Sequence, residues 1–141
     1  MLFALLLLDS CKTETSEESV PTVVEENLSS VEDGNLYQET QEFQERLQGT
    51  WKRIDYPFSR YRFKDDKAKL ISEGQAEEPE FIPFELLKSC RFADEANAVL
   101  APEEFILNYK EYESCELIHI RNDTLRVAAL DVNYEIFYTK Q

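Results

Sequence analysis

The chain has 141 residues, of which 43% are hydrophobic and 31% charged, a composition typical of one soluble domain and too short for two substantial cores. Its 29 acidic residues outnumber its 15 basic ones, for a formal net charge of −14. This charge argues against a nucleic-acid binder, which must neutralise phosphates with a clustered basic surface, and it disfavours anionic lipid headgroups as peripheral ligands.

A short apolar run occupies residues 2–8 and is followed closely by Cys11. The run is too short to span a bilayer as a helix, but it has the length of a signal-peptide hydrophobic region. The segment "LDSC" resembles the lipobox of bacterial lipoproteins, which implies that Cys11 receives acyl chains and becomes the mature N-terminus. The alternative is an ordinary core strand or helix with an incidental cysteine. We predict that residues 1–11 are a lipoprotein signal segment.

An acidic stretch rich in Ser, Thr and Glu follows Cys11 and extends over residues 12–35. Such a composition buries too little apolar surface to fold, so we predict a disordered tether that holds a domain away from a membrane. The segment "CKTETSEES" also resembles the loose signal that sends some Gram-negative lipoproteins to the cell surface. The expected location is therefore the outer membrane of a bacterial envelope, with its periplasmic and surface faces both left open.

The segment "LYQETQEFQERLQG" places Leu36, Phe43 and Leu47 on one stripe of a helix, and Gly49 follows as a C-terminal stop. Polar side chains fill the opposite face. The spacing predicts a short amphipathic helix of about three turns that leads into the domain.

Beyond Gly49 the apolar residues alternate with polar ones, which is typical of half-buried antiparallel strands. The predicted strands are 50–56, 59–65, 67–73, 84–92, 103–109, 114–120, 124–130 and 132–139. About eight antiparallel strands joined mostly by short turns predict an all-β domain over residues 36–141, closed as an up-and-down barrel. A barrel of this size is filled by side chains or holds one small ligand. Another β-sandwich or an open sheet remains the alternative.

The chain's only tryptophan lies in Gly49-Thr50-Trp51, where the predicted helix meets the first strand. This arrangement resembles the Gly-x-Trp start of lipocalins and related calycin barrels. The resemblance implies that Trp51 plugs the closed end of the barrel, and that Lys140 covers its ring by a cation–π contact. It also implies a small lipocalin-like domain of a bacterial lipoprotein, a group whose members generally have no assigned biochemical activity.

Few residues suit catalysis or metal binding. His119 is the only histidine and is expected to be a strand residue with local hydrogen bonds, since no Cys-x-x-Cys or paired-histidine spacing accompanies it. The chain has only three glycines and no glycine-rich phosphate loop. We therefore expect no enzyme, no cofactor and no metal site.

If Cys11 is acylated, Cys90 and Cys115 form an even pair in an oxidising compartment. A disulfide between them would contribute about 3 kcal/mol to stability. In a strict meander, however, an intervening strand separates their backbones by roughly 10 Å, which is beyond bridging distance. A disulfide and two free thiols both remain open.

Two functions fit these observations. The first is the binding of a small hydrophobic ligand in the barrel mouth. The candidate lining residues are the aromatics Phe63, Phe84, Phe105, Tyr109, Tyr134 and Tyr138. The second is a structural or interaction lipoprotein whose filled barrel docks to another envelope protein. The candidate docking patch is the basic set Lys52, Arg53, Arg60, Arg62, Lys64, Lys67 and Lys69.

Overall fold

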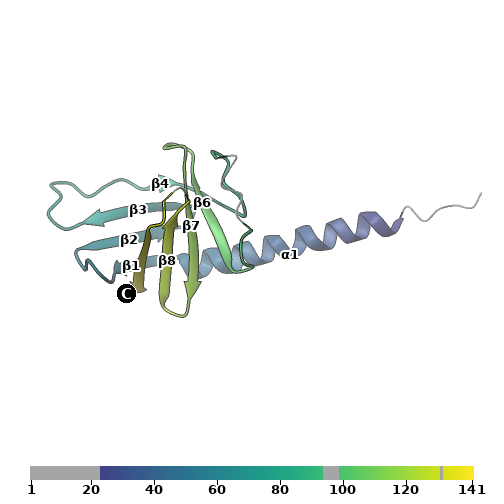
Figure 1. Cartoon of the computed structure of the whole chain (residues 1–141), viewed down its shortest axis with the longest axis horizontal. Helices are drawn as coiled ribbons and strands as arrows, with labels where there is room; N and C mark the ends of the chain where they lie inside the picture. Colours follow the sequence, from purple (N-terminus) through teal and green to yellow (C-terminus); the bar gives the residue numbers. More distant parts are fainter. Residues whose placement is uncertain (1–22, 94–98, 131) are drawn as a thin grey trace, which may run out of the picture.

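The computed structural model describes residues 23–93, 99–130 and 132–141. One helix, α1 (Val23–Leu47), precedes nine strands (Figure 1). The strands are β1 (Gly49–Arg53), β2 (Ser59–Lys64), β3 (Lys67–Ser72), β4 (Ile82–Pro83), β5 (Glu85–Leu87), β6 (Glu104–Tyr109), β7 (Ser114–Arg121), β8 (Thr124–Ala129) and β9 (Glu135–Lys140).

The strands form one antiparallel sheet that curls into a nearly closed barrel. The order across the sheet is β4-β3-β2-β1-β9-β8-β7-β6-β5. Hydrogen-bonded neighbours are thus consecutive in the chain, except that β1 also pairs with β9 and joins the first strand to the last. Because β1 and β9 pair with each other, neither of these strands is an exposed edge of the sheet. The predicted all-β up-and-down barrel with a preceding helix is confirmed.

The predicted strand 84–92 differs most from the structure. The chain pairs with β3 through Ile82 and Pro83, then with β6 through residues 85–87, and Phe84 lies between the two pairings with its ring buried. One extended segment therefore contacts both edges of the barrel and counts as two short strands. This change of partner accounts for nine strands in place of about eight.

Helix α1 is longer than the three turns expected, because it begins at Val23. Residues 23–35, which were expected to be part of a disordered tether, are helical in the structure, and residues 12–22 lie outside the described residues. Once a helix is nucleated at one end, each added residue forms one more backbone hydrogen bond. The helix can therefore extend beyond the part whose apolar stripe packs on the domain. Of the predicted stripe, Phe43 and Leu47 are buried and Leu36 is 43% exposed.

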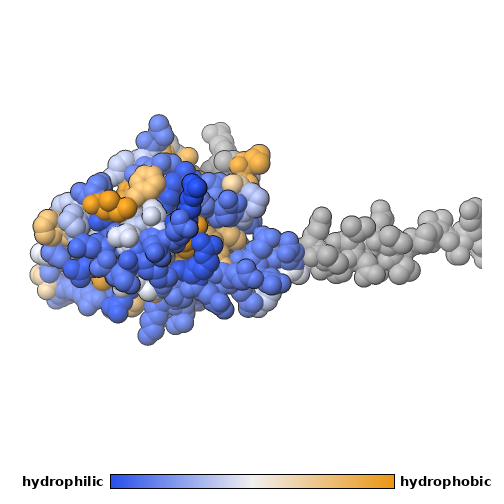
Figure 2. Space-filling model, turned by 90° about the horizontal axis from the view of Figure 1, so that it is seen from below, coloured by the Kyte–Doolittle hydropathy of each residue, from blue (hydrophilic) through white to orange (hydrophobic). Residues whose placement is uncertain are grey.

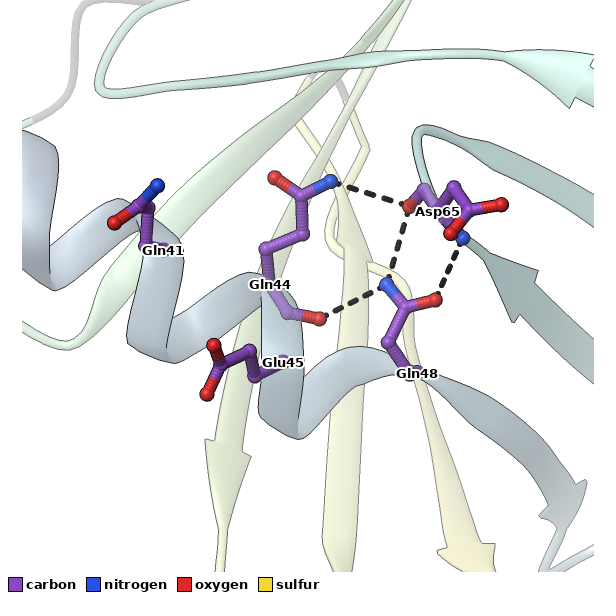
Figure 3. Close-up of a pocket in the computed structure, with 5 residues that line it drawn as sticks. All are labelled: Gln41, Gln44, Glu45, Gln48 and Asp65. Carbon is purple, nitrogen blue, oxygen red and sulfur yellow. Dashed lines mark hydrogen bonds between the residues drawn. The ribbon is translucent and has the colours of Figure 1, made fainter.

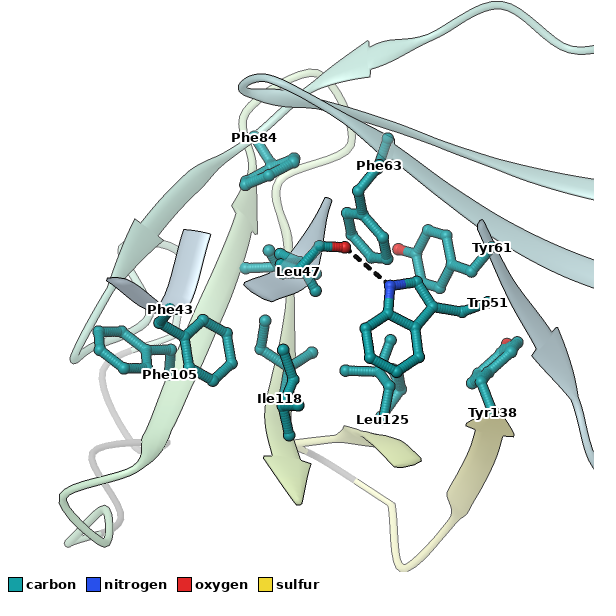
Figure 4. Packing of buried hydrophobic residues seen from close by; sticks show 14 of the residues in the cluster. Phe43, Leu47, Trp51, Tyr61, Phe63, Phe84, Phe105, Ile118, Leu125 and Tyr138 are labelled. Atoms are coloured by element: carbon teal, nitrogen blue, oxygen red, sulfur yellow. Dashed lines mark hydrogen bonds between the residues drawn. The ribbon is translucent and has the colours of Figure 1, made fainter. Parts of the chain in front are cut away.

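The core lies between the last turns of α1 and the inner face of the barrel (Figure 4). Its buried members are Phe43, Leu47, Trp51, Tyr61, Phe63, Ala68, Phe84, Phe105, Leu107, Tyr109, Ile118, Ile120, Leu125, Val127 and Tyr138. The ring of Phe43 packs on that of Phe105, with centroids 4.5 Å apart, and thereby attaches the helix to β6.

The closed end of the barrel is built where α1 passes into β1. Gly49 has φ +105°, which favours glycine, and its backbone turns the chain from helix to strand. Trp51 is fully buried, and its indole N–H donates to the carbonyl of Leu47 at 2.7 Å (Figure 4). Lys140 lies with Nζ 4.8 Å from the centroid of the Trp51 ring and donates to the carbonyl of Arg46 at 2.6 Å.

These two side chains therefore satisfy carbonyls at the helix C-terminus that have no intrahelical partner. The ammonium of Lys140 also lies at the negative end of the helix dipole. The predicted contact between Lys140 and Trp51 is present, and it serves the helix end as well as the ring.

A second contact joins α1 to the turn between β2 and β3 (Figure 3). The side-chain amide of Gln48 accepts from the backbone N–H of Asp65 at 2.7 Å and donates to its carbonyl at 3.1 Å. Gln44 donates to the same carbonyl at 3.2 Å. Asp65 has φ +55°, an uncommon conformation for a residue with a side chain, so these bonds hold a turn of restricted geometry.

Cys90 and Cys115 are joined by a disulfide, with their Cα atoms 5.8 Å apart. Cys90 lies beyond β5, in a segment that folds back over the outer face of β6. Asn108 of β6 holds this segment, since its side chain donates to the carbonyl of Ser89 and accepts from the backbone N–H of Arg91. The intervening strand β6 therefore does not keep the two cysteines apart, because Cys90 reaches Cys115 across the outer face of β6.

Candidate functional site

A cavity of about 230 Å³ opens at the end of the barrel away from α1. Along β9, Lys140 pairs with Trp51 at the closed end, and Tyr138 pairs with Arg53 farther up the wall. Ile136 lies two residues beyond, in the open half. The cavity is lined by Tyr61, Ala68, Lys69, Leu70, Ile82, Tyr109, Tyr112, Ser114, Glu116, Val127, Ile136 and Tyr138.

Three hydrogen-bonding groups from separate strands meet in this cavity. The hydroxyl of Tyr61 on β2 donates to Oε2 of Glu116 on β7 at 2.8 Å. The same hydroxyl contacts that of Tyr109 on β6. Since a tyrosine has one hydroxyl proton, and that of Tyr61 goes to the carboxylate, Tyr109 is the donor in the bond between the two hydroxyls. The result is a chain of hydrogen bonds that ends on Glu116.

Burial controls the protonation of this chain. It raises the pKa of the Glu116 carboxyl, and the hydrogen bond from Tyr61 opposes this shift only in part. Burial, reinforced by the nearby carboxylate, also raises the pKa of Tyr61 and of Tyr109. The same causes raise the pKa of Tyr138 to about 12. The three tyrosines are therefore neutral hydrogen-bond donors at physiological pH.

The predicted ligand residues separate into three groups. Tyr109 and Tyr138 line the cavity. Phe63, Phe84 and Phe105 are buried in the core and do not line it. Tyr134, expected on the inner face, precedes β9 and is 52% exposed, with its hydroxyl accepting from Arg53 at 3.0 Å. The strand begins three residues later than predicted, so the inward alternation does not extend back to Tyr134.

Glu116 was not identified from the sequence, although a signal was present. In "SCELIHI" it shares one alternating row with Ile118 and Ile120, both of which are buried. Placing a carboxylate at an inward-facing position of a strand costs free energy. Such a residue therefore usually belongs to a functional site or to a polar network.

The outer surface offers different chemistry. The face seen in Figure 2 is mainly hydrophilic, with its hydrophobic residues in small separate patches. A shallow groove across the outer faces of β7, β8 and β9 contains His119, and Arg126 within it forms ion pairs with Glu104 at 2.6 Å and Glu135 at 3.0 Å. Within residues 23–93, 99–130 and 132–141, no group of three or more histidine, cysteine or acidic side chains is arranged to hold a metal ion.

The proposed lipid anchor, Cys11, lies outside the described residues. In the part of the chain that the structure describes, no helix is both long and apolar enough to cross a bilayer. Comparison of the chain with protein-family models, curated proteins and solved structures found no match.

Proposed function

We propose that this protein is a non-enzymatic, lipocalin-like lipoprotein that binds a small, largely apolar ligand in the barrel mouth. The observation that carries the proposal is the open cavity of about 230 Å³ with an apolar wall and a few convergent polar groups. Ligand sites generally combine these two features. The apolar wall is contributed by Leu70, Ile82, Val127 and Ile136.

The dimensions of the cavity limit the ligand. Typical sites for drug-sized molecules enclose about 300–1,000 Å³, so this cavity accepts a smaller molecule or one end of a longer one. Leu70 and Tyr112 line the cavity and are about half exposed. These two side chains therefore lie where they would cover the part of a ligand that extends beyond the mouth.

Native mass spectrometry of the full chain, purified from a bacterial envelope, tests the proposal. We expect a co-purifying small molecule that is absent from Leu70→Trp, a variant that fills the mouth from a half-exposed position. Phe137→Trp is the matched control, because Phe137 is also half-exposed but points outward from β9. An adduct that survives in Leu70→Trp would place the ligand elsewhere. A bare mass for the wild-type protein would contradict the proposal.

The membrane anchor is part of the same proposal and has its own test. Cys11→Ser removes the acylation site, so we expect it to move the protein from the membrane fraction to the soluble fraction. Membrane association that does not change in this variant would exclude the lipid anchor and leave the ligand site unaffected.

One observation favours a second function, docking to another envelope protein. On the outer face of β1, β2 and β3, the register pairs Lys52 with Arg60, Arg62 with Lys69, and Lys64 with Lys67. Like charges directly opposite each other destabilise a sheet. Two ion pairs, Arg60 with Glu73 and Lys69 with Glu78, offset only part of this repulsion.

An acidic partner would offset the remainder. The reversal Arg62→Glu, combined with Lys64→Glu, is therefore expected to abolish cross-linking to such a partner. Cross-links of equal yield in the double variant would contradict docking through this face.

A further inference from the structure

Glu116 combines three properties that are unusual for the carboxylate of a small domain. It lines the mouth cavity, it is half-buried, and it forms no ion pair with any residue that the structure describes. Its one side-chain hydrogen bond comes from the neutral hydroxyl of Tyr61.

We propose that the mouth cavity selects organic ammonium ions on a short apolar chain over neutral or anionic molecules with the same chain. This inference rests on the proposed ligand-binding function and specifies the class of ligand. Its basis is the position of the Glu116 carboxylate in the wall of a cavity that is otherwise lined mainly by apolar side chains and tyrosines.

The first step of the argument is electrostatic. A ligand that enters the cavity removes the remaining water from Glu116, and a carboxylate that loses water without gaining a positive charge is costly. A neutral ligand leaves this cost in place, and an anionic ligand adds repulsion. An ammonium group removes the cost, because it brings both the opposite charge and N–H donors.

The second step concerns the walls. Tyr61, Tyr109 and Tyr138 surround the carboxylate from β2, β6 and β9 and contribute their rings to the cavity. Aromatic faces attract cations, and the attraction is strongest where water is excluded. Because burial keeps these hydroxyls protonated, they add no competing negative charge.

The third step concerns cations already present. Lys69 of β3 borders the cavity, but its register partner is Arg62 on the outer face of the sheet. Its Nζ is bonded to Glu78 at 2.5 Å and lies 4.4 Å from the ring centroid of Phe81. Arg53 of β1 is held by Asp55 at 2.7 Å and by Tyr134 at 3.0 Å. Both cations are therefore engaged by other partners, so neither is available to pair with Glu116, whereas an ammonium ligand would be.

Three probes with the same apolar chain test the selectivity directly: hexylammonium, hexan-1-ol and hexanoate. Each is titrated by calorimetry at neutral pH into the full chain carrying Cys11→Ser, so that no acyl chain competes for the cavity. Binding is localised by NMR of isotope-labelled tyrosine rings. We expect hexylammonium to bind at least tenfold more tightly than hexan-1-ol, and hexanoate to bind most weakly.

Glu116→Gln keeps the size of the side chain and its ability to accept from Tyr61 but removes the charge. It is expected to abolish the tenfold preference for hexylammonium. Hexan-1-ol should bind this variant at least as tightly as the protein with an intact Glu116, because no carboxylate has to be dehydrated. Glu111→Gln is the matched control, because it removes one negative charge from an exposed position in the β6–β7 connection. The preference should persist in this control.

The outcomes separate the inference from the function on which it rests. Equal binding of the three probes, with shifts at the cavity tyrosines, would overturn ammonium selectivity and retain small-ligand binding. Absence of binding by all three at millimolar concentration would contradict both. If Glu116→Gln fails to fold, the three affinities of the protein with an intact Glu116 still decide the question.

Discussion

Replacing Trp51 with alanine tests the structure of the closed end of the barrel. The side chain is fully buried in the core cluster, and its N–H is bonded to the carbonyl of Leu47 at 2.7 Å. Truncating a buried tryptophan costs about 3–5 kcal/mol, and a lost hydrogen bond that leaves a carbonyl unpaired adds about 1–3 kcal/mol. We therefore expect Trp51→Ala to lose at least about 4 kcal/mol of unfolding free energy. Small domains are stable by only about 5–15 kcal/mol, so the variant would be close to unfolding.

The assay is urea unfolding followed by far-UV circular dichroism, which does not depend on tryptophan fluorescence. Trp51→Phe retains most of the apolar volume and loses the N–H donor, so a smaller loss of about 1–3 kcal/mol is expected. Tyr56→Ala is the control, because Tyr56 is half-exposed and its removal should cost under about 1 kcal/mol. A loss below about 1 kcal/mol for Trp51→Ala would refute the assignment of Trp51 as a core residue that caps the helix.

Three further predictions follow from individual contacts. Reducing the bond between Cys90 and Cys115, which are separated by 25 positions, should lower the unfolding free energy by about 3 kcal/mol; equal urea midpoints with and without reductant would contradict this. Gln48→Ala removes both bonds to the backbone of Asp65 and should cost about 1–2 kcal/mol in the same assay, whereas no loss would show that the turn needs no support. Because burial raises the folded-state pKa of Glu116 above its ordinary value of 4.5, the native state holds this proton to higher pH than the unfolded chain does. Stability attributable to this residue is therefore lost as pH rises from about 4.5 through the raised pKa, and Glu116→Gln should gain stability relative to wild type over that window. A difference between the two proteins that stays constant with pH would contradict the assignment.

The amino-acid sequence by itself determined the local pattern of the barrel. Alternation in "SRYRFK" assigned Tyr61 and Phe63 to the interior, and both are buried. The pattern is informative because successive side chains of a strand point to opposite faces, so one polar and one apolar row define which face is inside. The position of Gly49 at the helix end was predictable for a similar reason, since few other residues adopt its backbone conformation.

Tertiary structure alone decided the features that depend on contacts between distant segments. The bond between Cys90 and Cys115 forms because the chain folds back over β6, and no local pattern records such a path. The cavity likewise brings Tyr61, Tyr109 and Glu116 together from three strands that are far apart in the chain. Periodicity places each of these residues on the inner face, but only the closure and register of the barrel set which inward side chains meet and where the interior remains open.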